Sequence, residues 1–426
     1  MAKMKYQFDT EENRQFLTDI REELFSFGRQ FPSPGGSSYY LGDDGTPWKD
    51  RARETWITSR MAHVYSLGML LRQADPTVSE GMISYEDCRK LAERALAGLS
   101  KELKDSQHGG WYAGITANGD VIPGKQCYAH AFVILAASSL YLARIEGADA
   151  LLDEALQIYD RYFWEDPEGL ACDTWDTEFS CKDDYRGLNA NMHSVEAFLA
   201  VYDVLHDPAY LERAGRIIRH VISWAQNAQW RIPEHFTKDW EPDLQKNREK
   251  PDDPFKPYGA TPGHGIEWAR LILQWEAANS KLSSVRNDDH IMAARNLYQR
   301  AISDAWNCDG APGIVYTTDW EGRPVVHDRM HWTLAEAINT SAVLFRVTGS
   351  QEYARDYAMF MEYLDQFVLD HNKGSWFHQL DRENHLVGTV WPGKSDLYHA
   401  VQATLIPYNE NIGVSIAAAC SGQEKR

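Results

Sequence analysis

Apolar side chains recur at helical spacing through most of the chain. Long stretches carry apolar residues three and four positions apart with polar residues between them, as in 190–204, 266–278 and 334–347. Because a helix completes a turn every 3.6 residues, this spacing places the apolar side chains on one face. Counting such stretches along the sequence predicts a mainly helical chain with about twelve helices.

Short aromatic segments divide these helical stretches into pairs. Each segment combines Gly or Pro with aromatic residues and a turn containing Asp, Asn or Gly, and the six segments are 39–43, 110–114, 172–176, 231–236, 314–320 and 375–381. Turns such as Ala117-Asn118-Gly119-Asp120 and Trp320-Glu321-Gly322 are typical of β-hairpins. The pattern therefore predicts six short hairpins with two helices per hairpin.

The helix that follows each hairpin recurs at a nearly constant interval. Its predicted starts lie near residues 49, 126, 188, 262, 330 and 394, so successive starts are 62 to 77 residues apart, close to one sixth of the 426 residues. Six repeated helix pairs can close into a ring of six inner and six outer helices. We therefore predict an all-α fold, an (α/α)6 barrel with short β-hairpins at one end. No linker rich in Pro, Gly or Ser interrupts the repeat, so we expect one domain over 1–426.

Charge and composition exclude several classes of protein. The chain has 43 Lys and Arg against 62 Asp and Glu, a net charge of −19. Nucleic acids and anionic membranes are bound by basic surfaces, so we expect neither as a partner. No run of about 18 apolar residues predicts a membrane span, and the N-terminus lacks the apolar segment of a secretory signal. Six scattered cysteines without a CxxC pair fit a reduced, cytoplasmic protein.

The predicted ring brings six helix starts together. Its inner helices run parallel, so their N-termini meet at one end, and polar or aromatic residues in their first turns should face one pocket. These residues are Trp56 and Arg60; Gln126, Tyr128 and His130; Asn189 and His193; His264 and Glu267; His331 and Trp332; and Asp396 and His399.

Two of these histidines are the strongest candidates for acid–base chemistry. His264 follows Thr261-Pro262-Gly263, which is typical of a helix start, and His399 lies about one turn after a predicted start near Ser395. The positive end of a helix disfavours imidazolium, so both rings should be neutral at pH 7 and able to remove a proton from carbon next to a carbonyl. We expect Glu267 to orient His264 or bind a substrate hydroxyl, and Arg60 to hold a sugar oxygen or an enediolate.

Structural roles are the simpler interpretation for other histidines. A histidine near a helix start is more often structural than functional, and we expect this of His63, His130, His235 and His331. The sequence separation of His327 and His331, or of His264 and Glu267, would suit a metal ion. No HExxH motif and no third ligand at a characteristic spacing accompany either pair, so we predict no metal site.

Two further classes stay open at this point. A glycoside hydrolase needs two carboxylates that flank the scissile bond, and Asp176, Glu178, Glu267 and Asp396 are the candidates. A non-catalytic sugar-binding protein would also suit an aromatic pocket. The segment between the fourth hairpin and His264, which includes the charged stretch 241–253, predicts a long solvated loop over the pocket.

Several motifs along nearly the whole chain identify a resemblance. They are Trp56-Ile57-Thr58-Ser59-Arg60-Met61, Gly109-Gly110-Trp111-Tyr112, Asn189-Ala190-Asn191-Met192-His193, Pro254-Phe255-Lys256-Pro257-Tyr258-Gly259, Pro262-Gly263-His264-Gly265-Ile266-Glu267-Trp268 and Asp396-Leu397-Tyr398-His399. Together they resemble the N-acylglucosamine 2-epimerase family, and within it the aldose–ketose isomerase branch. The resemblance implies an (α/α)6 barrel and catalysis without a metal or other cofactor.

The resemblance also assigns roles to individual residues. It implies that His264 and His399 are catalytic and that the substrate is bound by Trp56, Arg60, Tyr128, Asn189, His193, Glu267, Trp332, Gln379 and Trp391. The implied activity is the interconversion of D-mannose and D-fructose, with D-lyxose and D-xylulose as a second pair, through a cis-enediol. A 2-epimerase acting on an N-acylhexosamine or on the reducing end of a β-1,4-disaccharide is the alternative.

One segment departs from part of the family. Sulfosugar members carry an arginine-rich version of the segment around Phe255, whereas this chain has Pro254-Phe255-Lys256-Pro257. The resemblance therefore implies a small neutral monosaccharide as the partner of the pocket.

Overall fold

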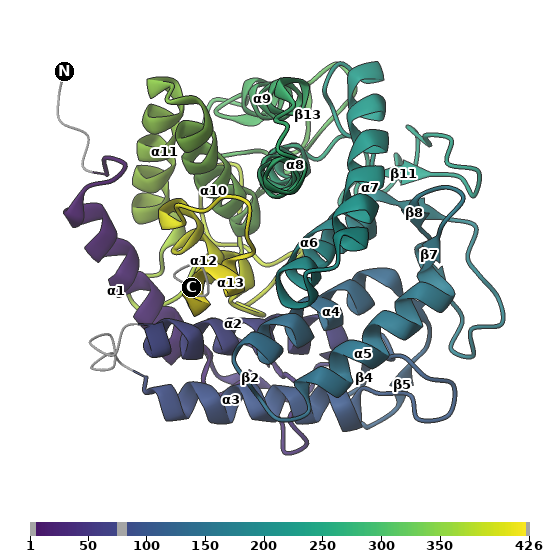
Figure 1. The fold of residues 1–426 in the computed structure, drawn as a ribbon. Coiled ribbons are helices and arrows are strands. Elements are labelled where there is room, and N and C mark those ends of the chain that lie inside the picture. Colours follow the sequence, from purple (N-terminus) through teal and green to yellow (C-terminus); the bar gives the residue numbers. More distant parts are fainter. Residues whose placement is uncertain (1–5, 75–82, 423–426) are drawn as a thin grey trace.

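The computed structural model describes residues 6–74 and 83–422 and shows two concentric rings of helices (Figure 1). The inner ring consists of α2 (Thr55–Ala74), α4 (Cys127–Leu142), α6 (Leu188–Leu205), α8 (Pro262–Ser283), α10 (His331–Thr348) and α12 (Tyr398–Ala403). The outer ring consists of α1 (Glu11–Gly28), α3 (Tyr85–Ala97), α5 (Ala148–Ile158), α7 (Pro208–Asn227), α9 (Asp288–Ala305) and α11 (Gln351–Tyr363). The predicted (α/α)6 barrel is therefore confirmed.

Helix burial follows from the residue pattern. The inner helices are buried on nearly every side. In α4, for example, every residue is buried except Tyr128 and Tyr141. The outer helices bury one stripe, as in α7, whose buried residues Leu211, Ile218 and Val221 recur at helical spacing. Apolar contacts between the two rings thus supply the core.

Short helical segments complete the ring. π-helical turns extend three outer helices, namely η2 (Gly98–Glu102), η3 (Tyr159–Phe163) and η4 (Leu364–Val368). After the short α12, the chain continues through the 3-10 turn η5 (Ile406–Tyr408) to α13 (Ile416–Ser421), which packs against α2, α4 and α6. The sequence pattern did not predict α13, which lies near the centre of the view in Figure 1.

The strands are only two or three residues long. They are β1 (Tyr40–Leu41), β2 (Pro47–Trp48), β3 (Arg53–Glu54), β4 (Gly114–Ile115), β5 (Val121–Ile122), β6 (Lys125–Gln126), β7 (Trp164–Glu165), β8 (Leu170–Ala171), β9 (Thr174–Trp175), β10 (Arg186–Gly187), β11 (His235–Phe236), β12 (Thr317–Thr318), β13 (Pro324–Val326), β14 (Arg329–Met330) and β15 (Gln379–Leu380). Four antiparallel pairs are hairpins: β1–β2, β4–β5, β7–β8 and β12–β13.

The hairpin prediction is wrong for three segments. In 172–176, 231–236 and 375–381 the local turn retains only an isolated bridge: Trp175 opposite Lys182, Phe236 opposite Pro242 and Leu380 opposite Leu386. Their strands β9, β11 and β15 pair instead with β6, β10 and β14, which precede an inner helix of the preceding repeat. Hydrophobic periodicity indicates that a strand exists but not which strand pairs with it.

These inter-repeat pairs hold the inner helix starts at one end of the barrel. β3–β4, β6–β9, β10–β11 and β14–β15 each join the residues before an inner helix to the residues after the next outer helix. The bridge between Ala260 and Thr318 does the same before α8. The backbone N–H of Lys394 donates to the carbonyl of Leu41 (3.0 Å), which links the sixth repeat to the first and closes the ring.

Buried ion pairs reinforce this end of the barrel. The fully buried Lys125 amine lies 2.8 Å from Asp105 Oδ2, and the equally buried Lys394 amine lies 2.7 Å from Asp370 Oδ2. Burial alone would raise the pKa of both carboxyls, but the bound lysine amines and neighbouring backbone N–H groups hold both pKa values below the ordinary range. The segments that precede α4 and α12 are thus fixed by charge as well as by backbone pairing.

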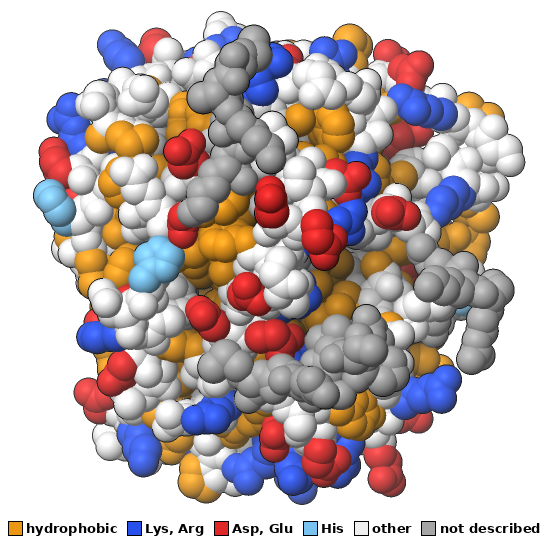
Figure 2. All heavy atoms as spheres, turned by 90° about the vertical axis from the view of Figure 1, so that its left-hand side faces the viewer, with side chains coloured by type: hydrophobic (Ala, Val, Ile, Leu, Met, Phe, Trp, Pro, Cys, Tyr) orange, Lys and Arg blue, Asp and Glu red, His pale blue; other side chains and the backbone are white. Residues whose placement is uncertain are grey.

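The surface carries interspersed charges on the face that includes α1 and α11. Figure 2 shows Lys and Arg side chains mixed with Asp and Glu there, instead of a continuous basic patch. Within 6–74 and 83–422, no helix combines the length and the apolar composition needed to cross a bilayer. All six cysteines are free thiols, as the scattered spacing predicted.

Candidate active site

A pocket opens at the end of the barrel where the inner helices begin. It encloses about 670 Å³, part of it open to solvent, and all six inner helices contribute to its wall. Ten of the eleven predicted site residues line it: Trp56, Arg60, Tyr128, Asn189, His193, His264, Glu267, Trp332, Trp391 and His399. The convergence predicted from the helix starts is therefore confirmed for every first-turn residue named except Gln126 and His130, which do not line the pocket.

Three pocket histidines are each bonded to a buried glutamate. The Nδ1 atoms of His264, His399 and His193 lie 2.9 Å from Glu234, 3.1 Å from Glu336 and 3.3 Å from Glu196, respectively. A carboxylate accepts the Nδ1 proton, which in a neutral ring leaves the lone pair on Nε2. The three pairings therefore favour the tautomer that a general base requires.

Burial keeps two of these rings neutral. It lowers the pKa of His193 to about 4, although Glu196 opposes the shift. Burial also holds the pKa of His399 well below its ordinary value, and the nearby charge of Arg60 lowers it further. This direction agrees with the neutrality predicted for His399, but its causes are burial and Arg60 and not the helix start.

Glu267 does not orient His264, contrary to the first of its two predicted roles. The partner of His264 is Glu234, which precedes β11, whereas Glu267 Oε1 has no hydrogen-bond partner and lies 3.6 Å from Arg270 Nη2. Arg270 directs its Nε–H to Glu336 instead (2.7 Å). Burial and the nearby Glu336 raise the pKa of Glu267 well above its ordinary value. These surroundings favour the protonated form of Glu267, which lines the pocket.

Arg60 is held rigidly at the pocket wall. Its Nη1 lies 3.3 Å from Asp396 Oδ2, and its Nη2 donates to the Tyr128 hydroxyl (2.9 Å). The guanidinium also lies over the rings of Trp56 and Tyr398, 4.8 and 4.7 Å from their centroids. A fixed cation in a largely buried wall is well suited to stabilise negative charge that develops on a substrate oxygen.

Trp332 lies against both candidate catalytic rings. Its ring centroid is 5.0 Å from that of His264 and 5.9 Å from that of His399. A Cβ atom at Gly263 would approach the Trp332 ring to 2.7 Å, so the glycine of the PGH motif makes this close packing possible.

The predicted loop does extend over the pocket. Residues between β11 and α8 form an irregular segment, and Pro254, Phe255 and Pro257 line the pocket from it. Phe255 is 45% exposed, and its ring meets those of Trp391 and Trp56 edge to face, with centroids 5.3 and 6.2 Å apart. These aromatic rings narrow the mouth of the pocket.

Gln379 does not line the pocket, although the resemblance assigned it to substrate binding. It is fully buried, its amide donates to Asp328 and Thr389, and its carbonyl oxygen accepts from the backbone N–H of Val390 and Trp391, both at 2.9 Å. Gln379 therefore holds the loop that presents Trp391.

The other histidines divide into two groups. His331, predicted to be structural, lines the pocket and stacks on His378 with centroids 3.8 Å apart. His63, His130 and His235 lie outside the pocket wall and are bonded within the fold, as expected of structural residues.

Metal-ligand geometry occurs at a different place from the pairs considered in the sequence. His327 precedes α10 and bonds Asp309 (2.8 Å), so it shares no helix face with His331. In the described part of the chain, His193, Glu196 and Glu267 offer ligand atoms within 4.8 Å of one another. Glu196 already accepts from His193, Tyr398 and Gln402, and Arg270 lies beside Glu267, so these ligand atoms are occupied by internal partners or face a cation.

The hydrolase interpretation loses half of its candidate carboxylates. Asp176 and Glu178 do not line the pocket, and Asp176 bonds Ser180 in a turn. Asp396 is paired with Arg60, which lowers its pKa despite burial. Of the four candidates only Glu267 is left in the wall without a hydrogen-bond partner for its Oε1, whereas a hydrolase needs two carboxylates that flank the bond.

Sequence reasoning missed the residues that support the histidines. They are Glu196, Glu234, Glu336 and Arg270, none of which lies in a first turn of an inner helix. A signal for Glu196, Arg270 and Glu336 was present, because each interrupts a helix that is otherwise almost continuously buried. A charge at such a position requires a partner. Arg270 and Glu336 pair with each other between adjacent inner helices, whereas Glu196 is bonded by His193 of its own helix and by Tyr398 of α12.

Comparison with known proteins matches this architecture. The family model for N-acylglucosamine 2-epimerase (GlcNAc 2-epimerase) matches residues 35–403. The chain is 42% identical to a D-mannose isomerase from Pseudomonas cannabina pv. alisalensis over 384 residues, which cover 90% of this chain and 89% of that protein. It is 37% identical to a D-mannose isomerase from Thermobifida fusca, over 93% of this chain and 94% of that protein.

A solved structure shows the same fold. The crystal structure of a D-mannose isomerase superposes with a TM-score of 0.82 at 25% identity, covering 94% of this chain and 98% of that one. The match to the family model covers most of the residues and includes all six inner helices. On these matches, the chain belongs to the N-acylglucosamine 2-epimerase family of enzymes.

Proposed function

We propose that the protein is a cofactor-independent aldose–ketose isomerase that interconverts D-mannose and D-fructose, with D-lyxose and D-xylulose as a second substrate pair. The observation that carries this proposal is the pairing of His264 with Glu234 and of His399 with Glu336 on one pocket wall. Isomerisation needs a base at carbon and proton exchange at two oxygens, and these rings supply the required free lone pairs.

The proposed reaction conserves the proton that moves between carbons. His264 assists opening of the sugar ring, and His399 then removes the C2 proton while the C–H electron pair forms the C1=C2 double bond. The electrons of the C1 carbonyl move to O1, and His264 accepts the O2 proton and delivers it to O1 across the cis-enediol. The carbonyl then forms at C2 as the double-bond electrons take the proton that His399 returns to C1. Each histidine ends the cycle in its starting protonation state.

Charge stabilisation falls to Arg60 and Glu267 in this scheme. His193 does not share this role, because its Nδ1 bond to Glu196 leaves Nε2 as an acceptor. We assign His193 to accept a substrate hydroxyl proton and Glu267 to donate a hydrogen bond as a neutral carboxylic acid, supported by its burial and by the carboxylates around it. Trp56, Trp332 and Trp391 shape the wall, and Tyr128 and Asn189 complete it.

The partner in this proposal is a small neutral monosaccharide. The segment around Phe255 contains no arginine that could bind an anionic sulfosugar. Its one cation is Lys256, whose amine lies over the Tyr185 ring, 3.8 Å from the ring centroid. A reduced, cytoplasmic setting fits the six free thiols, and neither nucleic acid nor membrane is a partner in this proposal.

Product analysis tests the proposal directly. The protein is incubated in D₂O with mannose, fructose, glucose or lyxose, with and without EDTA, and the products are followed by NMR. We expect fructose from mannose, at a rate that EDTA leaves unchanged. Glucose as the first product would favour a 2-epimerase, sugar binding without C2 proton exchange would favour a binding protein, and activity restored only by a divalent ion would contradict the metal-free mechanism.

A further inference from the structure

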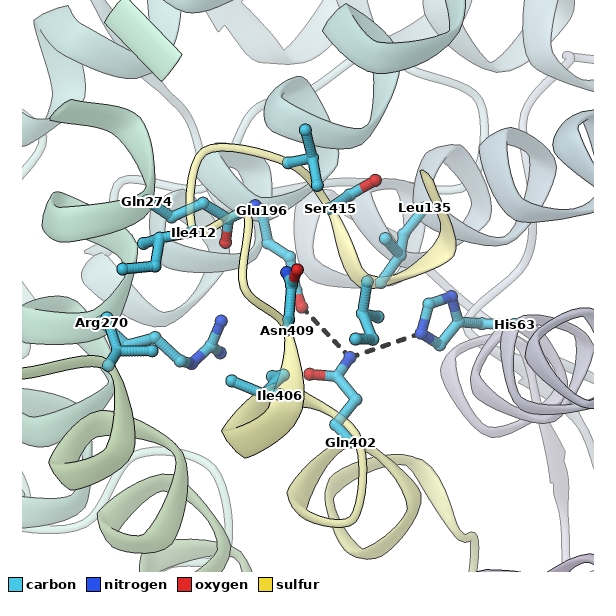
Figure 3. Close-up of a pocket in the computed structure, with 13 residues that line it drawn as sticks. His63, Leu135, Glu196, Arg270, Gln274, Gln402, Ile406, Asn409, Ile412 and Ser415 are labelled. Carbon is cyan, nitrogen blue, oxygen red and sulfur yellow. Dashed lines mark hydrogen bonds between the residues drawn. The ribbon is translucent and has the colours of Figure 1, made fainter. Parts of the chain in front are cut away.

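A buried arginine lies behind the catalytic pocket. Arg270 belongs to α8, is 3% exposed and does not line the pocket that holds the candidate catalytic residues. It lines a separate cavity behind that pocket, where Figure 3 shows its guanidinium extending toward the middle of the barrel, with Glu196 and Gln402 across from it. Arg270 therefore has no direct contact with a sugar in the pocket, and the proposed reaction gives it no role.

The guanidinium is bound to the carboxylate that holds His399. Arg270 Nε donates to Oε2 of Glu336 (2.7 Å), and the other oxygen of that carboxylate, Oε1, lies 3.1 Å from His399 Nδ1. Glu336 belongs to α10 and is fully buried. One buried carboxylate therefore bridges a cation on α8 and an imidazole on α12.

Arg270 controls the charge of this bridge. Burial raises the pKa of Glu336 above its ordinary value, and the charge and hydrogen bond of Arg270 oppose this shift. A second acid lies beside the same cation, because Glu267 Oε1 is 3.6 Å from Arg270 Nη2 and has no hydrogen-bond partner among the described residues. Since the guanidinium is closer to Glu336, it favours the ionised form of Glu336 over that of Glu267. The charged and titratable groups that face Glu336 are Arg270 and Glu267 of α8, Glu196 and His193 of α6, and His399 of α12.

The charge of Glu336 determines which nitrogen of His399 carries the proton. An ionised carboxylate only accepts hydrogen bonds, so the proton of the neutral ring lies on Nδ1 and the lone pair on Nε2. A protonated carboxyl instead donates its O–H to Nδ1, and the ring proton then lies on Nε2, where it prevents the ring from acting as a base.

We propose that Arg270 is a positioning residue of the reaction: by holding Glu336 as a carboxylate, it keeps Nε2 of His399 free to accept the sugar proton. The expected effect on turnover rests on the proposed function, whereas the position of the ring proton does not.

Two variants remove this control in different ways. In Arg270→Met the side chain loses its charge, so the buried Glu336 takes up a proton and the proton of His399 moves to Nε2. Glu336→Gln keeps Arg270, whose Nε–H holds the amide oxygen. The amide NH2 is then directed at His399 Nδ1 and requires a lone pair there. Both variants should therefore move the ring proton to Nε2, and Glu336→Gln tests the proposal even if Arg270→Met fails to fold.

Nitrogen NMR of isotope-labelled histidine measures this effect without a substrate. The two ring nitrogens of a neutral imidazole give separate signals, and comparison with His264→Ala and His399→Ala assigns the signals of these two rings. At neutral pH we expect the proton of His399 on Nδ1 in the wild type and on Nε2 in both variants. His264 is the internal control, because its partner is Glu234 and not Glu336, and it should keep a proton on Nδ1 in every protein.

Steady-state kinetics on mannose measure the consequence for turnover. Arg270→Met and Glu336→Gln should each lower kcat by roughly 10²-fold or more, because a positioned base is lost, and should change KM less, because neither residue lines the pocket. Arg270→Lys keeps the cation and should retain more kcat than Arg270→Met. The matched control is Arg72→Met, because Arg72 is a buried arginine of the inner helix α2 that pairs with Glu22 and lines neither cavity. Its loss should lower stability but leave kcat and the His399 signals unchanged.

Two results would overturn the proposal. One is a proton on Nε2 of His399 in the wild type, or a proton that stays on Nδ1 in Glu336→Gln. The other is an equal loss of kcat in folded Arg270→Met and Arg72→Met, which would show that the loss of any buried arginine explains the effect. If the ring proton moved as expected but the wild type converted no sugar, the proposed function would be wrong while the control of His399 by Arg270 would stand.

Discussion

The Nδ1 atom of His264 lies 2.9 Å from Oε1 of Glu234, a residue thirty positions earlier in the chain. Glu234 directly precedes β11, whose pairing with β10 also fixes the start of α6. One short ladder therefore aligns the carboxylate that orients a ring on α8 with the helix that presents His193. The catalytic geometry depends on a strand pair outside the inner helices.

Replacing this carboxylate by an amide should impair catalysis more than folding. In Glu234→Gln the side chain keeps its size but no longer dictates which ring nitrogen of His264 carries the proton, so kcat should fall at least about tenfold. Glu241→Gln, an exposed change in the adjacent loop, is the matched control. Steady-state kinetics on mannose, together with thermal unfolding of both variants, would show the difference. Near-normal kcat in Glu234→Gln would mean that the tautomer is set by another group.

Removal of either imidazole that we propose to be catalytic should lower turnover with little loss of stability. We expect His264→Ala and His399→Ala each to reduce kcat by roughly 10²-fold or more, the usual contribution of a positioned acid or base. Both rings face the pocket instead of packing the core.

His130→Ala provides the contrasting case for these two variants. His130 Nε2 accepts from the buried Trp111 backbone N–H (3.2 Å), so its loss should cost about 1–3 kcal/mol of unfolding free energy. Urea unfolding and kinetics of the three variants would test this. If His264→Ala or His399→Ala unfolded readily yet kept a normal kcat, the replaced histidine would be structural and not catalytic.

The sequence predicts the barrel well because its repeat is long and regular. The predicted starts near 188, 262 and 330 lie within one residue of α6, α8 and α10, whereas the start near 49 precedes α2 by six residues. That helix follows β3, whose partner β4 is more than fifty residues away in the chain. Strand pairing of this kind depends on tertiary contacts, which hydrophobic periodicity does not encode.

Apart from Gln126 and His130, the first-turn residues were correctly predicted to line the pocket, but the residues that support the histidines were not predicted. Ring closure alone brings His264, His399 and Arg60 to one pocket, so their convergence followed from helix order. Which carboxylate orients which imidazole depends on side-chain directions between neighbouring helices. For this reason Glu267, adjacent in sequence, was predicted for the role that Glu234 has in the structure. Gln379 shows the same limit, since it acts on Trp391 from behind the wall.

Glu267 should be protonated in the folded protein at neutral pH. The pKa of Glu267 is raised in the folded protein, so the unfolded chain loses this proton at lower pH than the folded chain does. Glu267 therefore makes the protein less stable as pH rises from the ordinary glutamate pKa to the raised value. Glu267→Gln removes that dependence. Its stability relative to wild type should therefore improve by about 1.4 kcal/mol per pH unit across this window.

Two measurements check the state of Glu267. Urea unfolding of Glu267→Gln and wild type at pH 5 and pH 8 should show the relative gain at the higher pH. Infrared spectra should contain a protonated carboxylic acid band in the wild type that the variant lacks. A constant stability difference and no such band would show that Glu267 is ionised and that Arg60 alone stabilises the enediolate.

Buried neutral histidines should make the protein sensitive to acid. Burial lowers the pKa of His63, His193 and His331 to about 4, from an ordinary value of 6.5. The stability that depends on these rings is fully present above pH 6.5, because both states are then neutral. It is lost as pH falls toward 4, because only the unfolded chain takes up the protons.

A single substitution isolates one of these protons. His63 lies outside the catalytic pocket, so His63→Gln should flatten the dependence of unfolding free energy on pH between 6 and 4.5 by about 1.4 kcal/mol per pH unit. His385→Gln, at a residue whose side chain is 77% exposed, should leave the slope unchanged. Urea titrations at several pH values give both slopes, and equal slopes in the two variants would contradict a buried neutral His63.

The fate of the C2 proton distinguishes an isomerase from an epimerase. An isomerase can use one base on one face of the enediol, whereas C2 epimerisation must deliver a proton to the opposite face. Here His399 is 4% exposed and lies behind Trp332, and Phe255 and Trp391 narrow the mouth of the pocket. A sheltered base exchanges its proton slowly with water. We therefore expect [2-²H]mannose in H₂O to give mainly fructose with partial retention of deuterium at C1, little glucose, and no conversion of cellobiose.

Widening the mouth of the pocket should lower deuterium retention in fructose more than it changes kcat. Phe255→Ala removes the 45%-exposed ring that contacts Trp56 and Trp391 but none of the hydrogen bonds to His264 or His399, so kcat should change less than about tenfold while deuterium retention falls. Val121→Ala, at a side chain that is 42% exposed and outside the pocket, is the control. NMR and mass spectrometry of early fructose give the retention. Complete washout in the wild type would mean that His399 exchanges freely with solvent, and glucose ahead of fructose would replace the isomerase by an epimerase.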